Sequence, residues 1–411
     1  IVFQQLLDTI IFGFDLTYFS LPYKIRIDYF YPYPSSKEGN EFNPMSTIKQ
    51  SYHGSDIEII EKVYNIPKEE IINFSGNVNP LGVSKTVKEE LAAHLDLIST
   101  YPDRNYTTLR QKIGTYVDTN PKNIIVGNGA TELISILIQN LKPTHALIIG
   151  PTYSEYEREI RLEGGNVHYY ALTESLDFQI HVPDLLQQIT TSIGLLVICN
   201  PNNPTSSAFS QKDLIQILEH CKKTNTFVLI DETYMEFATN ITDLTAIPLI
   251  PKYENLMVLR GVSKFFAAPG LRLGYGICGN SSLLETIQQQ KNPWTLNTLG
   301  SFAGEIMFED YEYMEKTKVL IGKERNRIYK ELLTWPEIHP YPPIANFILV
   351  KIKKENLSAS KVFENLIQQK MMIRDASSFP FLDPRFFRFC FMMPDQNDQL
   401  LAALKLILNQ D

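Results

Sequence analysis

A lysine and an aspartate stand where they could do carbonyl chemistry. Lys264 lies among Val262, Phe265 and Phe266, so we expect burial to lower its pKa and to make its amine a nucleophile for aldehydes. Asp231 directly follows an apolar run. A carboxylate in that position either caps a helix or pairs with a buried cation. Together the two side chains indicate a site that captures a carbonyl compound.

Other side chains could hold a phosphate and an aromatic ring. Gly129, Ala130 and Thr131 open a predicted helix, whose free N–H groups and positive dipole end suit a phosphate. Arg272 can add a positive charge to the same anion, and Tyr153 can stack on a ring. A phosphate, an aromatic ring with a basic nitrogen and an aldehyde captured by lysine together describe pyridoxal phosphate.

Strands that alternate with helices would position these side chains. The β-rich apolar runs are Asn123–Val126, Ala146–Ile149, Leu195–Cys199, Phe227–Ile230 and Leu256–Leu259. Helical patterns between them cover Glu132–Asn140, Tyr156–Glu163 and Lys212–Lys222. This alternation predicts an α/β fold with a mostly parallel sheet covered on both faces. Ligands of such sheets bind beyond the carboxyl ends of the strands, where polar residues follow all five runs, so we predict one polar crevice there.

Composition excludes several classes of protein. The chain has 411 residues, 44% of them hydrophobic, which is enough for a large core and about two or three domains. Its net charge of −8 disfavours nucleic acid as a partner. The 4 cysteines are far apart and form no CxxC or Cys/His cluster, so we expect no metal site, no disulfide framework and a cytoplasmic location. The chain has no run of about 20 apolar residues, which is the length that a membrane-spanning helix needs.

Residues 1–44 differ from the rest of the chain. Eleven of these 44 residues are aromatic, and the segment lacks the basic and small-residue features of a signal peptide. The first methionine after it is Met45. We therefore predict that the native protein starts at Met45 and that residues 1–44 are a non-native upstream extension. The alternative is an aromatic arm used at a subunit contact.

From about residue 53 to 408 the chain resembles fold-type I pyridoxal-phosphate enzymes of the aminotransferase I/II group. The matching motifs, in order, are Gly127–Leu133 (GNGATEL), Pro201–Thr205 (PNNPT), Asp231–Tyr234 (DETY) and Ser263–Tyr275 (SKFFAAPGLRLGY). The resemblance implies a seven-stranded, mostly parallel sheet in a large cofactor domain, residues 86–290, and a smaller α+β domain, residues 291–411. A helical link would run through Glu305–Leu333, and residues 45–85 would form an arm that joins the small domain.

The resemblance also implies a role for each matching residue. Lys264 would bond covalently to the cofactor aldehyde, and Asp231 would pair with the pyridinium nitrogen. Asn203 and Tyr234 would hydrogen-bond the phenolic oxygen, and Tyr153 would stack on the ring. The cofactor phosphate would be held by Ala130, Thr131, Ser263 and Arg272.

Two further matches concern the neighbouring subunit and the substrate. Tyr101 matches the tyrosine that reaches the partner's cofactor phosphate, which implies a homodimer with a shared active site. Arg388 matches the arginine that binds the substrate α-carboxylate. The chain departs from the group at Ser206, where glycine is usual, and at Gly261, where a hydroxylated residue often serves as a phosphate ligand.

Two subgroups compete for the chain: threonine-phosphate decarboxylase of cobalamin synthesis and histidinol-phosphate aminotransferase. Four segments resemble the decarboxylase: His53–Ile57 (HGSDI), Phe74–Gly82 (FSGNVNPLG), Lys264–Gly270 (KFFAAPG) and Pro293–Asn297 (PWTLN). Ser55 replaces the glycine expected in the first of them. The sequence therefore favours the decarboxylase, with histidinol-phosphate aminotransferase or a related amino-acid transaminase as the alternative. A non-catalytic binding module is a remote third possibility, because the chain has no basic patch for a DNA-binding domain.

Both subgroups handle small phosphorylated substrates. The candidate substrate-binding residues are Arg388, Arg374, His53, Asn77 and Trp294. Arg374 would be a second anion ligand or, alternatively, half of a surface ion pair with Asp375. His53 would contact the substrate phosphate or be a surface or capping histidine. Trp294 would line the substrate pocket or only pack at a hinge.

Overall fold

The computed structural model describes residues 52 and 54–409, which belong to one compact unit, Gln50–Asp411. The predictions for residues 1–44 and for His53 therefore lie outside the described residues. None of the described helices is long and apolar enough to span a membrane. All four cysteines are free thiols and are buried.

Seven strands form the larger sheet in the order β2-β8-β7-β6-β5-β3-β4. Their bounds are β2 Ile124–Asn128, β3 His145–Gly150, β4 Asn166–Ala171, β5 Leu195–Cys199, β6 Phe227–Asp231, β7 Leu256–Gly261 and β8 Leu273–Cys278. Strands β3 to β7 pair in parallel, whereas β8 runs antiparallel to both β2 and β7. The predicted α/β fold with a mostly parallel seven-stranded sheet is confirmed.

Two of these strands were not predicted as strands from their own sequences. Strand β4 (NVHYYA) lies at one edge of the sheet and is largely exposed or half-buried, so it lacks an apolar run. Strand β8 (LGYGIC) contains two glycines, which are unfavourable in strands unless another backbone must approach closely. A Cβ added to Gly274 would lie 2.3 Å from the backbone nitrogen of Ala130, so this close approach exists.

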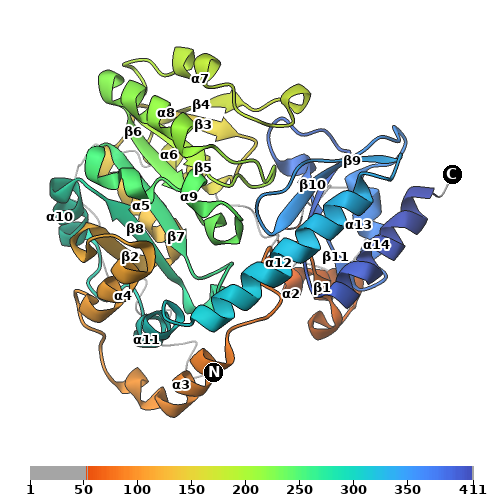
Figure 1. The fold of residues 1–411 in the computed structure, drawn as a ribbon, viewed down its shortest axis with the longest axis horizontal. Helices are drawn as coiled ribbons and strands as arrows, with labels where there is room; N and C mark the ends of the chain where they lie inside the picture. The colour runs from red at the N-terminus through yellow and green to blue at the C-terminus, as the bar shows by residue number, and fades with distance from the viewer. Residues whose placement is uncertain (1–51, 53, 410–411) are drawn as a thin grey trace, which may run out of the picture. The chain divides into compact units, whose positions relative to one another are not determined.

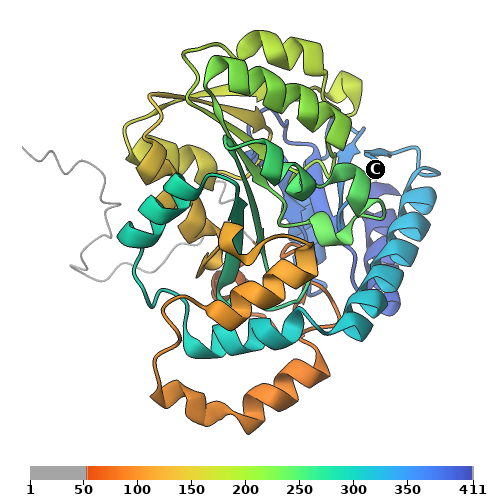
Figure 2. The same cartoon turned by 60° about the vertical axis from the view of Figure 1, so that its left-hand side comes forward.

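Helices cover both faces of the sheet. They are α4 Thr107–Val117, α5 Gly129–Leu141, α6 Glu155–Leu162, α7 Val182–Gln188, α8 Gln211–Thr224 and α10 Ser281–Gln290. Alternate residues of a strand enter different apolar clusters: Leu196 of β5 packs in the cluster that contains Ile217 of α8, and Val197 packs in the cluster that contains Leu137 of α5. Figure 2 shows helices on both sides of the sheet. With both faces covered, the carboxyl ends of the strands are left to form a site.

A second sheet supplies the opposite wall of that site. It is antiparallel, with the order β12-β13-β10-β9, and its bounds are β9 Ile338–Pro340, β10 Phe347–Ile352, β12 Arg374–Asp375 and β13 Phe386–Cys390. Helices α13 (Ala359–Ile367) and α14 (Pro394–Asn409) follow β10 and β13 in the chain.

The early part of the described chain joins this second region. Strand β1 (Ile72–Asn73) pairs in parallel with β11 (Met371–Met372), and the orange β1 lies beside the blue segments in Figure 1. Helix α2 (Ile57–Tyr64) precedes β1, and α3 (Lys85–Ala93) follows it. The residues that follow this pairing come close to the carboxyl ends of the large sheet, where Asn73 and residues 75–78 line a cavity.

The predicted helical link consists of two helices. Helix α11 covers Thr298–Met307, and α12 covers Tyr311–Leu332. The break between them occurs at Asp310, whose side chain caps α12 by accepting a hydrogen bond from the Tyr313 N–H at 3.1 Å. Helix α12 extends from the large sheet to the four-stranded sheet in Figure 1.

Candidate active site

A cavity of about 650 Å³ lies at the carboxyl ends of the parallel strands, as predicted for the polar crevice. The sequence-predicted residues that line it are Asn77, Ala130, Thr131, Tyr153, Asn203, Asp231, Tyr234, Ser263, Lys264, Arg272, Arg374 and Arg388. Gly54 and Ser55, the residues that follow His53, line it too. Segments from the whole length of the described chain therefore meet at one place.

Lys264 lies in the turn after β7 and is partly buried. Its Nζ donates a hydrogen bond to the carbonyl oxygen of Gly76 at 2.7 Å. Burial, together with the smaller effects of the positive charges of Arg388 and Arg272, lowers the pKa of Lys264 to about 8. A larger share of neutral amine than an ordinary lysine has is therefore available near neutral pH, and nucleophilic attack on a carbonyl requires the neutral amine.

Asp231 ends β6, and neighbouring donors fix the orientation of its buried carboxylate. Oδ1 accepts hydrogen bonds from the N–H and hydroxyl of Thr233, at 2.9 and 2.5 Å. Oδ2 accepts a hydrogen bond from the hydroxyl of Tyr156 at 2.7 Å. The carboxylate lines the cavity, where it can face a basic ring nitrogen.

The first turn of α5 and Arg272 form a cradle for a phosphate. Gly129 has a φ of +78°, and a Cβ at this position would lie 2.3 Å from Nη2 of Arg272. Only glycine allows the guanidinium so close to the helix N-terminus. The first N–H groups of a helix have no intrahelical acceptor, so the N–H groups of Ala130 and Thr131 are available to an anion. The donors present therefore fit the phosphate of pyridoxal phosphate.

The residues predicted for the phenolic oxygen and the ring also meet here. The Tyr234 hydroxyl accepts a hydrogen bond from Nδ2 of Asn77 at 3.3 Å, while Oδ1 of Asn77 is buried without a partner among the described residues. Asn203 accepts a hydrogen bond from Arg388. Tyr153 packs edge-on against Tyr156, with ring centroids 5.6 Å apart. An unsatisfied buried oxygen beside a phenol fits a site that receives a further polar group.

Arg374 and Arg388 are opposite each other in the pairing of β12 with β13. They are 3% and 5% exposed, so neither forms a surface ion pair, and the alternative reading of Arg374 is wrong. The Asp375 side chain instead accepts a hydrogen bond from the Ser377 N–H at 2.9 Å. Like charges that face each other across strands are destabilising. Such a pair is therefore expected where it binds anions.

Neutral oxygens hold both guanidiniums. Arg374 donates to the carbonyl oxygen of Tyr52 and, at 2.8 Å, to the hydroxyl of Ser378. Arg388 donates to Oδ1 of Asn203 and, at 2.6 Å, to the carbonyl oxygen of Ser75, while its Nε has no partner among the described residues. Burial and the neighbouring Arg388 lower the pKa of Arg374 to about 10, which leaves it protonated at neutral pH. The two positive charges thus face a single cavity.

Tyr101 and Trp294 lie on the surface, outside the lining of the cavity. They are 81% and 37% exposed, and their ring centroids are 5.0 Å apart. The guanidinium of Arg104 lies 4.5 Å from the centroid of the Trp294 ring. The contact of Tyr101 with a second subunit and that of Trp294 with substrate both stay predictions.

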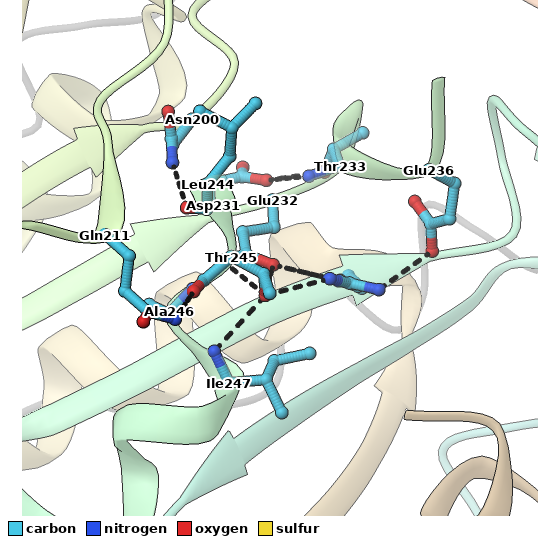
Figure 3. A network of polar contacts seen from close by, with 11 residues as sticks. Asn200, Gln211, Asp231, Glu232, Thr233, Glu236, Leu244, Thr245, Ala246 and Ile247 are labelled. Atoms are coloured by element: carbon cyan, nitrogen blue, oxygen red, sulfur yellow. Dashed lines mark hydrogen bonds and ion pairs between the residues drawn. The ribbon is translucent and has the colours of Figure 1, made fainter. Parts of the chain in front are cut away.

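Beneath Asp231 lies a buried charge network that the sequence reading missed (Figure 3). Glu232 accepts hydrogen bonds from Nε and Nη2 of Arg260 at 3.0 and 2.7 Å, from the Thr245 hydroxyl at 2.8 Å and from the Ala246 N–H at 2.6 Å. Since Glu232 follows β6 and Arg260 lies near the end of β7, the pair joins the strand ends that present Asp231 and Lys264. The sequence did contain a signal for this pair, since Glu232 and Arg260 have opposite charges and lie at the ends of two successive apolar runs.

Glu236 lies on the other side of the same guanidinium (Figure 3). Its Oε1 is 3.7 Å from Nη1 of Arg260, and neither carboxyl oxygen has a hydrogen-bond partner among the described residues. Burial raises the pKa of Glu236 to about 7, against the opposing effect of Arg260. The network therefore holds one fully paired carboxylate and one poorly satisfied one.

Comparisons with known proteins agree with this geometry. The family model for aminotransferase class I and II matches residues 69–404. A protein of Caldanaerobacter subterraneus subsp. tengcongensis, provisionally named a threonine-phosphate decarboxylase, is 38% identical over 80% of this chain and 88% of its own length. The threonine-phosphate decarboxylase of Salmonella typhimurium is 32% identical over 87% of this chain and 97% of its own length. The solved structure of the histidinol-phosphate aminotransferase from Clostridium acetobutylicum is 32% identical, with a TM-score of 0.76, over 82% of this chain and 98% of its own.

Proposed function

The chain belongs to the aminotransferase class I and II family, and we propose that it decarboxylates L-threonine O-3-phosphate. It is a pyridoxal-phosphate enzyme, either a decarboxylase or an aminotransferase. The proposed products are carbon dioxide and (R)-1-amino-2-propanol phosphate. Support comes from the two decarboxylase relatives and from the four decarboxylase-like segments of the sequence.

The proposal rests chiefly on the buried pair of Arg374 and Arg388. Threonine phosphate carries a carboxylate and a phosphate, and the two guanidiniums could bind one anion each. Charge-assisted hydrogen bonds of this kind contribute roughly 1.5–3 kcal/mol each. We assign the substrate carboxylate to Arg388, because Arg388 hydrogen-bonds Asn203, which is predicted to contact the phenolic oxygen of the cofactor. We assign the substrate phosphate to Arg374.

Bound pyridoxal phosphate supplies an electron-withdrawing ring that accepts the electron pair of a bond broken at the substrate Cα. The bond at Cα that the site's residues held perpendicular to the ring would be the one to break. Two anchored anions would turn the substrate so that the Cα–carboxylate bond takes this position. Asp231, fixed by Thr233 and Tyr156, would keep a proton on the ring nitrogen, and Lys264 would return a proton to Cα after carbon dioxide leaves.

The second candidate is histidinol-phosphate aminotransferase. It is favoured by the similarity to the Clostridium acetobutylicum structure, which is as identical in sequence as the Salmonella relative. In that reaction Lys264 would remove a proton from Cα and the carboxylate of the amino-group donor would stay intact. The choice therefore depends on which bond at Cα breaks.

A two-substrate assay separates the candidates. The purified protein, supplied with pyridoxal phosphate, is incubated with O-phospho-L-threonine, or with histidinol phosphate and 2-oxoglutarate. We expect carbon dioxide and the phosphorylated amine from the first mixture, and very slow reaction with unphosphorylated threonine. Rapid conversion of the second mixture without carbon dioxide from the first would establish the aminotransferase instead.

We also propose that two copies form a homodimer in the cytoplasm and share their active sites. The exposed side chain of Tyr101 is available to a second chain. Mixing Tyr101→Ala with Lys264→Ala tests this arrangement, since a heterodimer would hold one site with both residues intact. Recovery of activity on mixing is expected, and its absence despite demonstrated subunit exchange would contradict a shared site. The domain limits at residues 86 and 291 stay part of the proposal.

A further inference from the structure

We propose that Tyr156 is a positioning residue that orients Asp231 toward the cofactor ring nitrogen and supports the ring-stacking Tyr153. This inference rests on the proposed use of pyridoxal phosphate and holds for either reaction. Tyr156 lies outside the motifs that the chain shares with the aminotransferase I/II group. It lies in the first turn of α6, on a different element from the carboxylate that it contacts.

The hydrogen bond from Tyr156 to Asp231 completes the carboxylate's set of partners. Tyr156 is 1% exposed, and its hydroxyl donates to Oδ2 at 2.7 Å. The other oxygen, Oδ1, already accepts two hydrogen bonds from Thr233. Without the tyrosine, Oδ2 would lose this donor, and the carboxylate could turn about its Cβ–Cγ bond. Tyr156 therefore determines which lone pair of Oδ2 is left to face the cavity.

A second contact links Tyr156 to the ring of Tyr153. The two rings are perpendicular, with an interplanar angle of 86° and a centroid separation of 5.6 Å. Tyr156 also packs in the same apolar cluster as Ile160 of its own helix and Cys199 of β5. Strand β5 pairs with β6 so that Cys199 is opposite Asp231. Packing of α6 on β5 thus holds Tyr156 against Asp231 and Tyr153, the two predicted cofactor-binding side chains that it contacts.

Tyr156→Phe separates the two contacts, because it keeps the ring and removes only the hydroxyl. The hydrogen bond that is lost is charge-assisted, because its acceptor is a carboxylate. Its loss should affect activity because that carboxylate is Asp231, and the loss of a similar bond outside the site should not. The matched control is Tyr253→Phe. Tyr253 is also buried, and its hydroxyl donates to Oε1 of Glu219 at 2.7 Å, outside the cavity lining.

Three readouts are measured on both variants. For Tyr156→Phe we expect kcat to fall about ten- to a hundredfold with KM changed less than about twofold, a severalfold weaker affinity of the apoenzyme for pyridoxal phosphate, and a shifted pH titration of the visible cofactor band. Tyr253→Phe should match the wild type in all three. The melting temperature of each cofactor-free variant reports any general loss of stability.

A double-mutant cycle with Asp231→Ala tests whether Tyr156 acts through the carboxylate. In that background Tyr156→Phe should have little further effect on kcat, because the partner is gone. Full additivity, or a Tyr156→Phe enzyme with wild-type kcat, cofactor affinity and band, would overturn the inference. Failure of the proposed cofactor use is distinguishable, since the wild type itself would then bind no pyridoxal phosphate and show no visible band.

Discussion

Two regions beside the cavity differ in how their buried charges are balanced. We call the ends of β6 and β7 the floor and the four-stranded sheet the wall. On the floor, at the ends of β6 and β7, Glu232 is paired with Arg260 and hydrogen-bonded on both oxygens. On the wall, Arg374 and Arg388 face each other and are held by neutral oxygens. Paired charges join the ends of the two catalytic strands, whereas the hydrogen bonds of the wall's guanidiniums go to neutral oxygens, and Asp375 and Asp56 attract Arg374 only through space. We therefore expect the charge of the wall to be available to anions. Substitution of Asp231 or Lys264 should therefore impair chemistry, and substitution of Arg374 or Arg388 should impair substrate binding.

The largest effect is expected at Lys264. Lys264→Ala removes the amine that bonds the cofactor aldehyde, so activity should fall below detection. Borohydride reduction followed by mass spectrometry should find the cofactor fixed to the wild type and not to the variant. A reducible bond that survives in Lys264→Ala would place the nucleophile on another lysine.

Asp231→Ala should reduce kcat by about 10²–10⁴-fold with a much smaller change in KM. The opposite charge of the carboxylate favours the protonated ring nitrogen, which makes the ring a better electron acceptor. Steady-state kinetics with saturating pyridoxal phosphate measure both constants. A change confined to KM would mean that Asp231 is purely structural, and the contrast between floor and wall would fail.

On the wall, Arg374→Ala should raise KM for the phosphorylated substrate about ten- to a hundredfold, because one charge-assisted phosphate contact is lost. Arg385→Ala is the matched control, since Arg385 precedes β13, pairs with Asp383 at 2.8 Å and lies outside this cavity. The control should leave KM within about twofold of the wild type. An equal rise of KM in both variants would show that Arg374 acts only through the net charge of the protein and does not contact the phosphate.

The smallest effect concerns Glu236, the poorly satisfied carboxyl of the floor. Its pKa is raised to about 7 in the folded chain, mainly by burial, and is about 4.3 when unfolded. The groups that act on it are Arg260, Glu232, Lys318, Tyr116 and Tyr275. At a pH between these two pKa values, Glu236 is ionised in the unfolded chain but still protonated in the folded chain. Its contribution to stability is therefore greatest below about pH 4 and is lost as pH rises through 7.

In Glu236→Gln the side chain is neutral at every pH, so the loss of stability that ionisation of Glu236 causes at high pH should disappear. The variant should be more stable than the wild type at pH 8, by on the order of 1–3 kcal/mol, and the advantage should shrink toward pH 5. Urea unfolding at a series of pH values measures the difference. A constant difference across the series would show that Glu236 does not titrate in this range.

The floor could be predicted from the sequence to a greater extent than the wall. Lys264, Asp231 and the first turn of α5 each follow an apolar strand, so short local patterns indicated that they share one edge of a sheet. The supports of Arg374 and Arg388 come from Tyr52 and Ser75, more than 300 residues away in the chain, and no local pattern predicts such contacts. Tyr156 was missed for the same reason, because its contact with Asp231 spans two elements.

One departure from the family pattern also became interpretable only in the structure. Ser206 has a φ of 60°, the region that favours glycine, which explains why glycine is usual there. Its hydroxyl accepts hydrogen bonds from the N–H groups of Ile344 and Ala345, at 3.0 and 2.9 Å. These bonds join the loop after β5 to the segment that leads into β10 of the wall. The serine therefore gains contacts that offset the strain of its backbone.

The fate of the substrate carboxylate tests the central claim most directly. O-phospho-L-threonine labelled with ¹³C in the carboxyl group is given to the pyridoxal-phosphate-loaded enzyme, and trapped carbon dioxide and the phosphorylated amine are counted in the same reaction. The account predicts one labelled carbon dioxide for each amine formed, with no requirement for a 2-oxo acid. Retention of the label in a keto product, formed only when a 2-oxo acid is present, would contradict it.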